Sequence, residues 1–234
     1  MIPIEPHIRQ ILDDTYFRLH SCYPQIGKDF LDNVNRTRII FPPYGEDQNG
    51  EARVSEQELR FTFVEAFLNY ISKSENEFDC KYSVETPTVG KYLFSYGKKV
   101  KELEEKREKV EIPCIHKEGI SGNIDMVIHD KEGKKLCLIE FKANNPETED
   151  IEKDLVKLTN CEENDREIGK HIPRYFICMV RSTKPQVTKE NIEKKFNEIR
   201  NKTKDERNCE NVYIEYFNLA DGTTLYNEHF RFKN

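Results

Sequence analysis

Residues 135–143, with the sequence KLCLIEFKA, constrain the fold of this chain more than any other stretch. Successive side chains of a β-strand point to opposite faces, and both faces here are apolar apart from Glu140 and Lys142. A strand that is apolar on both faces is expected near the centre of a sheet. Because an unpaired buried charge is costly, we expect these two charges to have a partner, a metal ion or a function.

A second apolar stretch, residues 123–129 (NIDMVIH), lies just before the first. The intervening residues 130–134 (DKEGK) include Gly133, which is suited to the positive φ of a tight turn. The two stretches therefore predict a β-hairpin.

The register of this hairpin predicts a pair of acids. With a two-residue loop at positions 132 and 133, counting back places Asp125 directly opposite Glu140. Cross-strand neighbours lie about 5 Å apart at Cβ, so the two carboxylates would repel each other without a cation between them. One oxygen from each, about 2.1 Å from the ion, would suit Mg²⁺. Lys142 points to the same side.

The rest of the chain predicts helices and strands around the hairpin. Apolar residues at helical spacing predict four helices. The first contains Ile8, Ile11, Leu12, Tyr16 and Leu19, and the second runs from Ser55 to about Ser72 and opens with a Ser55/Glu58 capping box. The third begins at Thr148 and the fourth at about Thr188. Apolar runs predict strands over 174–180, 212–217 and 228–232.

These elements predict an α/β fold with a mixed β-sheet core flanked by helices, an N-terminal helical segment and a C-terminal β-hairpin. We expect residues 1–50, including a loop at 41–49 (FPPYGEDQN), to pack on a core domain of residues 51–234.

Composition narrows the functional class. The chain has 234 residues, 36% of them hydrophobic, and its longest apolar runs are too short to cross a bilayer. Its first residues, MIPIEPHIRQ, lack the basic and apolar regions typical of a secretory signal. Its seven cysteines are odd in number and widely spaced, as in a reduced compartment. We therefore expect a cytoplasmic protein without membrane contact. With a net charge of −6, any polyanion must be held by a local site.

The pattern of Asp125, fourteen intervening residues and then Glu140-Phe141-Lys142 resembles the PD-(D/E)xK nuclease superfamily. Members have a restriction-endonuclease-like core whose hairpin carries an Asp on one strand and (Asp/Glu)-x-Lys on the next. The resemblance covers residues 54–181, and Ile124 stands where the name-giving Pro would precede the Asp.

The resemblance implies a Mg²⁺- or Mn²⁺-dependent phosphodiesterase, with DNA favoured over RNA as the expected substrate. Asp125 and Glu140 would hold the metal, and Lys142 would steady the attacking water or the developing charge.

Similar proteins usually supply a further acid from the first core helix, where Glu56, Glu58 and Glu65 are the candidates. Glu56 and Arg60 fall on the predicted buried face, so Glu56 is the preferred third metal ligand. The capping box accounts for the acid at position 58 without a role in metal binding. Glu65 is expected to be a solvated surface carboxylate. Arg60 would contact a phosphate or form an ion pair.

Several alternatives stay open at this point. Asp125, Glu140 and Lys142 would also be explained by a buried salt-bridge network without chemistry. Lys153 and Lys157, in the helix from Thr148, could line a path for a nucleic-acid backbone, although surface solvation is the more typical role. The cysteines and histidines lack the Cys-x-x-Cys spacing of zinc sites.

Two further functions compete with a free-standing nuclease. One is a catalytically inactive nuclease-like fold that binds nucleic acid or protein. The other is a subunit that cleaves only when a partner protein delivers the substrate. The sequence pI of about 5.7 favours partner delivery over independent recognition of a DNA sequence.

Overall fold

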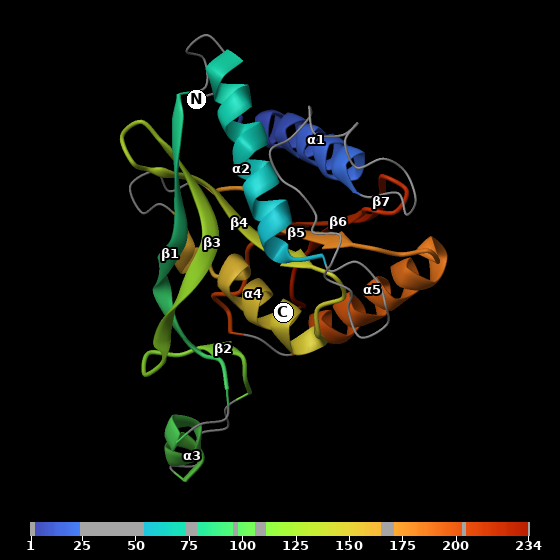
Figure 1. The fold of residues 1–234 in the computed structure, drawn as a ribbon. Helices are drawn as coiled ribbons and strands as arrows, with labels where there is room; N and C mark the ends of the chain where they lie inside the picture. Colours follow the sequence, from blue (N-terminus) through green and yellow to red (C-terminus); the bar gives the residue numbers. More distant parts are fainter. Residues whose placement is uncertain are drawn as a thin grey trace.

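A seven-stranded mixed sheet with helices on both faces forms the centre of the protein in the computed structural model (Figure 1). The structure describes residues 3–23, 54–73, 79–95, 98–105, 111–164, 171–202 and 205–233. The strands are β1 (Cys80–Leu93), β2 (Cys114–Ile115), β3 (Ile120–Asp130), β4 (Lys135–Ala143), β5 (Arg174–Val180), β6 (Val212–Asn218) and β7 (Thr223–Phe230). The helices are α1 (Glu5–Cys22), α2 (Glu56–Lys73), α3 (Lys98–Glu105), α4 (Thr148–Thr159) and α5 (Pro185–Arg200), with a 3₁₀ turn η2 at Cys161–Glu163.

The strands follow the spatial order β2-β1-β3-β4-β5-β6-β7. β4, β5 and β6 run parallel, and the other neighbouring strands pair antiparallel. Parallel neighbours need a crossover connection, and α4 and α5 provide the two that link β4 to β5 and β5 to β6. The predicted mixed sheet, N-terminal helices and C-terminal hairpin are therefore confirmed.

The helices form two layers over the sheet (Figure 1). α1 and α2 bury their apolar faces against one side of the sheet, and α4 and α5 cover the other side. On α2, Phe63 packs edge to face on Phe141 of β4, with 5.3 Å between ring centroids. This contact fixes α2 beside the strand that carries Glu140 and Lys142.

The turn between β3 and β4 is longer than predicted. It spans residues 131–134, and Oδ1 of Asp130 accepts hydrogen bonds from the N–H groups of Glu132 and Lys134, both at 2.9 Å. Gly133 has a φ of +88°, which explains why glycine stands there.

An irregularity next to the turn restores the predicted register. His129 pairs with Lys135, not with Leu136 as the two-residue loop predicts, and the register then shifts by one residue. From there the strands align as predicted, as far as the pair Met126 and Ile139. The next positions along the two strands are Asp125 and Glu140. The predicted alignment is thus confirmed as far as Met126 and Ile139, although the predicted turn is wrong.

β1, the longest strand, was not predicted. Its sequence, CKYSVETPTVGKYL, has little alternation of apolar and polar residues and contains Pro87 and Gly90, both of which disfavour strands. Most of its side chains are at least partly exposed. The strand exists because it pairs over almost its whole length with β3.

Other boundaries also shift. α5 begins at Pro185, ahead of the predicted start near Thr188, and β7 covers Thr223–Phe230 in place of residues 228–232. The predicted loop at 41–49 lies outside the described residues, and the division into residues 1–50 and 51–234 stays a prediction. The structure records no disulfide among the seven cysteines, all of which lie within the described residues. In the described part of the chain, no helix is both long and apolar enough to span a membrane.

Two phenylalanines of α2 give a matched test of this packing. Phe63 is fully buried against β4, so Phe63→Ala should lower the free energy of unfolding by about 3–5 kcal/mol. Phe61 is 58% exposed, and Phe61→Ala should change it by less than about 0.5 kcal/mol. Urea unfolding followed by circular dichroism measures both values. Equal losses would show that α2 does not pack as described.

Candidate functional site

Charged side chains of both signs meet where the first turns of α2 lie beside β3, β4 and α4. The carboxylates are Glu56, Glu85, Asp125, Glu140 and Asp154, and the cations are Arg60, Lys142 and Lys157. We call these eight residues the charged cluster. Five different elements contribute to it, so only the folded chain brings it together.

Asp125 lies on β3 and is tied to the neighbouring strand. Its Oδ2 accepts a hydrogen bond of 2.8 Å from the backbone N–H of Phe141 on β4. The recorded pairing of the two strands ends at Met126 and Ile139, one residue before Asp125 and Glu140. The structure thus brings these two predicted site residues close together on neighbouring strands, near enough for the charge of Asp125 to act on Glu140.

Glu140 is 1% exposed and faces α4. Its Oε1 lies 2.5 Å from the ammonium nitrogen of Lys157, which also contacts Asp154 at 2.9 Å and donates to the carbonyl of Asn123 at 2.8 Å. Gly122 leaves room for the Lys157 stem, since a Cβ at that position would lie only 3.1 Å from Lys157 Cδ. Lys157 is therefore a buried partner of Glu140, not the surface residue predicted.

Burial raises the pKa of Glu140 well above its ordinary value, and the nearby carboxylates of Asp154 and Asp125 act in the same direction. The ammonium of Lys157 opposes them. Glu140 therefore depends on cations for its ionised form, whether they come from the protein or from solution.

Lys142 points to the same side as Glu140. Its Nζ lies 2.7 Å from Asp154 Oδ2 and 3.8 Å from Glu56 Oε2. Burial works against its charge, but the carboxylates of Asp154, Glu140 and Glu56 outweigh burial and raise the pKa of Lys142. Lys142 is therefore a fixed positive charge at neutral pH and is unsuited to act as a general base.

The three acids of α2 occupy different environments. Glu56 contacts Arg60 at 3.0 Å and Lys142 at 3.8 Å, so it lies within the charged cluster. Glu58 accepts a hydrogen bond of 2.8 Å from the N–H of Ser55, as the capping box predicts. Glu65 pairs with Arg18 of α1 at 3.1 Å, although the sequence predicts a solvated carboxylate.

Glu56 also has a perturbed acidity. Burial raises its pKa, the charges of Asp125 and Asp154 act in the same direction, and Lys142 and Arg60 oppose them. Of the three acids in α2, Glu56 is the one that shares cations with the strand residues.

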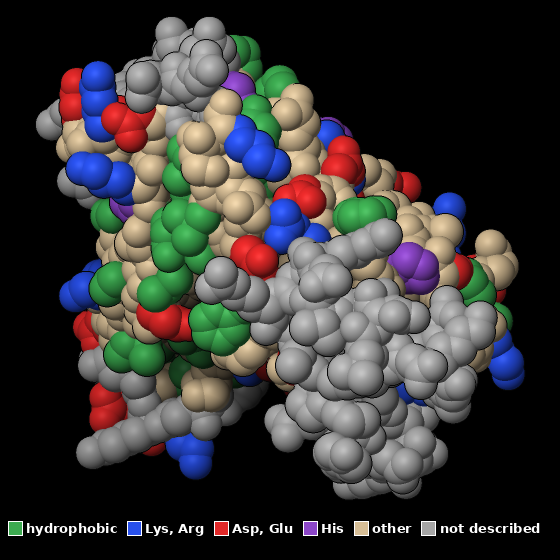
Figure 2. Space-filling view, turned by 45° about the horizontal axis from the view of Figure 1, so that its top comes forward, with side chains coloured by type: hydrophobic (Ala, Val, Ile, Leu, Met, Phe, Trp, Pro, Cys, Tyr) green, Lys and Arg blue, Asp and Glu red, His purple; other side chains and the backbone are tan. Residues whose placement is uncertain are grey.

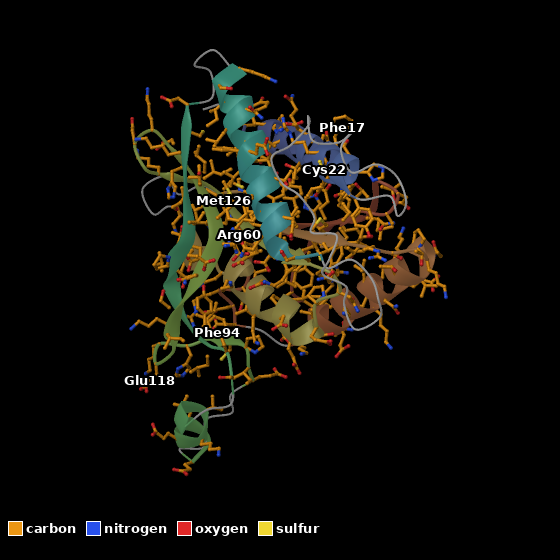
Figure 3. All side chains as sticks on the ribbon, in the orientation of Figure 1. Phe17, Cys22, Arg60, Phe94, Glu118 and Met126 are labelled. Atoms are coloured by element: carbon orange, nitrogen blue, oxygen red, sulfur yellow. The ribbon has the colours of Figure 1, made fainter. Side chains whose placement is uncertain are left out.

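Arg60 bridges the cluster to β1. Its guanidinium contacts Glu56 at 3.0 Å, Asp125 at 2.7 Å and Glu85 at 2.9 Å. Figure 3 labels Arg60 where one end of α2 lies against β3. Of the two alternatives left open by the sequence, the structure shows the ion pair.

Two acids of the cluster were missed at the sequence level. Asp154 stands one turn before Leu158 and one turn after Ile151, so its position beside the apolar line of α4 was the available signal. Glu85 gave no signal, because β1 itself was not predicted. Lys153, the other lysine weighed on α4, pairs with Asp150 at an exposed position outside the cluster.

The donor atoms of the cluster suit a hard cation. Carboxylate oxygens are the ligands that Mg²⁺ and Mn²⁺ prefer. Glu140 Oε1 and Asp154 Oδ2 are buried and lie near ammonium groups, but neither accepts a hydrogen bond of normal geometry. The five carboxylates of the cluster outnumber its three cations by two, a charge that one divalent ion would balance.

The observed arrangement is nevertheless one of protein ion pairs. Over the described ranges, no three carboxylate, imidazole or thiol groups are placed so that they could hold one metal ion. Each acid of the cluster faces a lysine or arginine instead.

Comparisons with protein-family models, with curated proteins and with solved structures found no match for this chain. Functional inference therefore depends on the charged cluster itself.

The lysines of α4 provide a matched test of the cluster. Lys157→Met leaves the buried Glu140 without its ammonium partner and should lower the free energy of unfolding by about 3–5 kcal/mol. Lys153→Met removes an exposed pair and should cost less than about 1 kcal/mol. Chemical denaturation of both variants measures the difference, and equal values would contradict the buried pair.

The same variant has a predicted pH dependence. Because burial raises the folded-state pKa of Glu140 above its ordinary value, the folded Lys157→Met protein retains a proton that the unfolded chain releases. Its stability should therefore fall as the pH rises above the ordinary pKa of a glutamate. Adding Glu140→Gln should remove this fall, since the titrating group is gone. A pH-independent stability of Lys157→Met would contradict the assignment.

Proposed function

We propose that the protein is a metal-dependent nuclease that hydrolyses phosphodiester bonds, and we favour DNA over RNA as its substrate. One observation carries the proposal. Asp125, Glu140 and Lys142 lie on two adjacent antiparallel strands within one charged cluster, which Glu56 of the neighbouring helix also joins. This is the set that the resemblance to the PD-(D/E)xK superfamily implies.

The order of the elements supports a restriction-endonuclease-like core. An acid-bearing helix, α2, precedes the β3–β4 hairpin, and α4 then crosses over to the parallel strand β5. These are the elements over which the resemblance extends.

Asp125 and Glu140, with Glu56, would hold Mg²⁺ or Mn²⁺. A bound divalent ion would polarise the scissile phosphate and lower the pKa of a water molecule. Lys142 keeps its proton at neutral pH and can stabilise the negative charge that grows on the phosphate. No residue of the cluster is required to form a covalent intermediate.

The surface charge supports delivery of the substrate by a partner protein. On the face shown in Figure 2, the described basic side chains are scattered among acidic ones and do not form one patch. The net charge of −6 gives no general attraction for a polyanion. A partner that binds DNA would supply the attraction that this face lacks.

The ion pairing favours one alternative function. Because every acid of the charged cluster already faces a protein cation, the fold could persist without a metal ion. The second candidate is therefore a catalytically inactive nuclease-like module that binds nucleic acid or protein.

Cleavage assays separate the two candidates. The wild type should nick or cut DNA in Mg²⁺ or Mn²⁺ and be inactive in EDTA, with plasmid, single-stranded DNA and RNA tested in parallel. Asp125→Asn, Glu140→Gln and Lys142→Ala should each lower the rate by about 100-fold or more, because each removes charge needed in the transition state. Lys142→Ala should leave much of the metal affinity intact, since a lysine is not a metal ligand in this scheme.

Variants of α2 serve as controls. Glu56→Gln should lower activity and metal affinity, whereas Glu58→Gln and Glu65→Gln, which remove a cap and a pair to α1, should retain wild-type activity. Wild-type rates in Asp125→Asn would contradict the nuclease. An inactive wild type that binds no divalent ion would favour the binding module.

A further inference from the structure

Arg60 occupies a position in the charged cluster that a metal ion would also need. Its Nη2 lies 2.7 Å from Asp125 Oδ1 and 3.0 Å from Glu56 Oε1. These two carboxylates are both candidate metal ligands, and a single guanidinium nitrogen satisfies them together. Arg60 itself is largely buried, with 12% of its side chain exposed.

The oxygens of Asp125 are both engaged. Oδ2 accepts from the backbone N–H of Phe141 at 2.8 Å, a bond that also anchors Asp125 to β4. Oδ1 is the oxygen that Arg60 holds. A cation that takes Oδ1 as a ligand must therefore compete with Arg60, and the bond to Phe141 can remain.

Glu85 offers Arg60 a second position. Glu85 lies between the paired positions Val84–Met126 and Thr86–Ile124, which places it across the strands from Asp125. Its φ of +47° is unusual for a residue other than glycine, and its Oε1 lies 2.9 Å from Arg60 Nη1. Arg60 could keep this contact to β1 after losing its contacts to Asp125 and Glu56.

We propose, on the basis of the nuclease function proposed above, that Arg60 is a resident counter-ion that a divalent metal ion displaces from Asp125 and Glu56. In the metal-free protein the guanidinium balances the repulsion between these acids. When the metal ion binds, Arg60 keeps only its contact to Glu85, and the carboxylates of Asp125 and Glu56 become available to the metal ion. This exchange explains why the described acids are paired with protein cations and not arranged around one ion.

The proposal predicts that removing Arg60 tightens metal binding. Arg60→Met keeps an unbranched side chain and removes the charge, so it should bind Mn²⁺ about tenfold more tightly or better than the wild type. In the absence of metal the same variant should melt at a lower temperature, and Mn²⁺ should raise its melting temperature more than that of the wild type. Titration calorimetry and thermal unfolding measure these quantities without requiring a substrate.

Two further variants complete the experiment. Arg18→Met removes an arginine that pairs with Asp14 and Glu65 outside the cluster, and its Mn²⁺ affinity should equal that of the wild type. Arg60→Gln repeats the loss of charge with a polar side chain, in case Arg60→Met does not fold.

The outcomes distinguish the two proposals. Tighter binding by Arg60→Met or Arg60→Gln, including binding seen only in these variants, supports displacement. Equal or weaker binding, with Mn²⁺ still bound by the wild type, overturns the role of Arg60 and leaves the nuclease standing. Absence of Mn²⁺ binding in the wild type and in both Arg60 variants overturns the two proposals together.

Discussion

The pairing of β3 with β4 brings Asp125 and Glu140 close together on neighbouring strands, and the surrounding elements balance their charge. α4 supplies Lys157 to Glu140, and α2 supplies Arg60 to Asp125. An acid buried without such a partner would cost several kcal/mol. The helices on both sides of the sheet are therefore fixed by ion pairs as well as by apolar packing.

Stability and the proposed chemistry use the same residues. Lys142 and Lys157 share Asp154 as a common partner, so α4 holds both lysines against β4. Such a network keeps charged groups in place within a buried region, which is what an electrostatic catalyst requires. The surplus of two carboxylates makes the cluster receptive to a cation, while its ion pairs allow the protein to fold before one arrives.

Much of the fold follows from local patterns. The hairpin strands, β5 and the helices α1, α2 and α4 were predicted because their apolar residues recur with the period of a strand or helix. β1 escaped prediction because its side chains are largely exposed and it contains Pro87 and Gly90. Its conformation depends on pairing with β3, a contact between segments far apart in the chain.

For the cluster, the sequence by itself determined which faces the strand residues occupy. The two-residue period of a strand puts Glu140 and Lys142 on one side, and the hairpin brings Asp125 near Glu140 on the neighbouring strand. Only the tertiary structure decided the partners. Lys157 and Glu85 join the cluster because α4 and β1 pack beside the hairpin, and an ion pair between such distant segments leaves no periodic trace in the sequence.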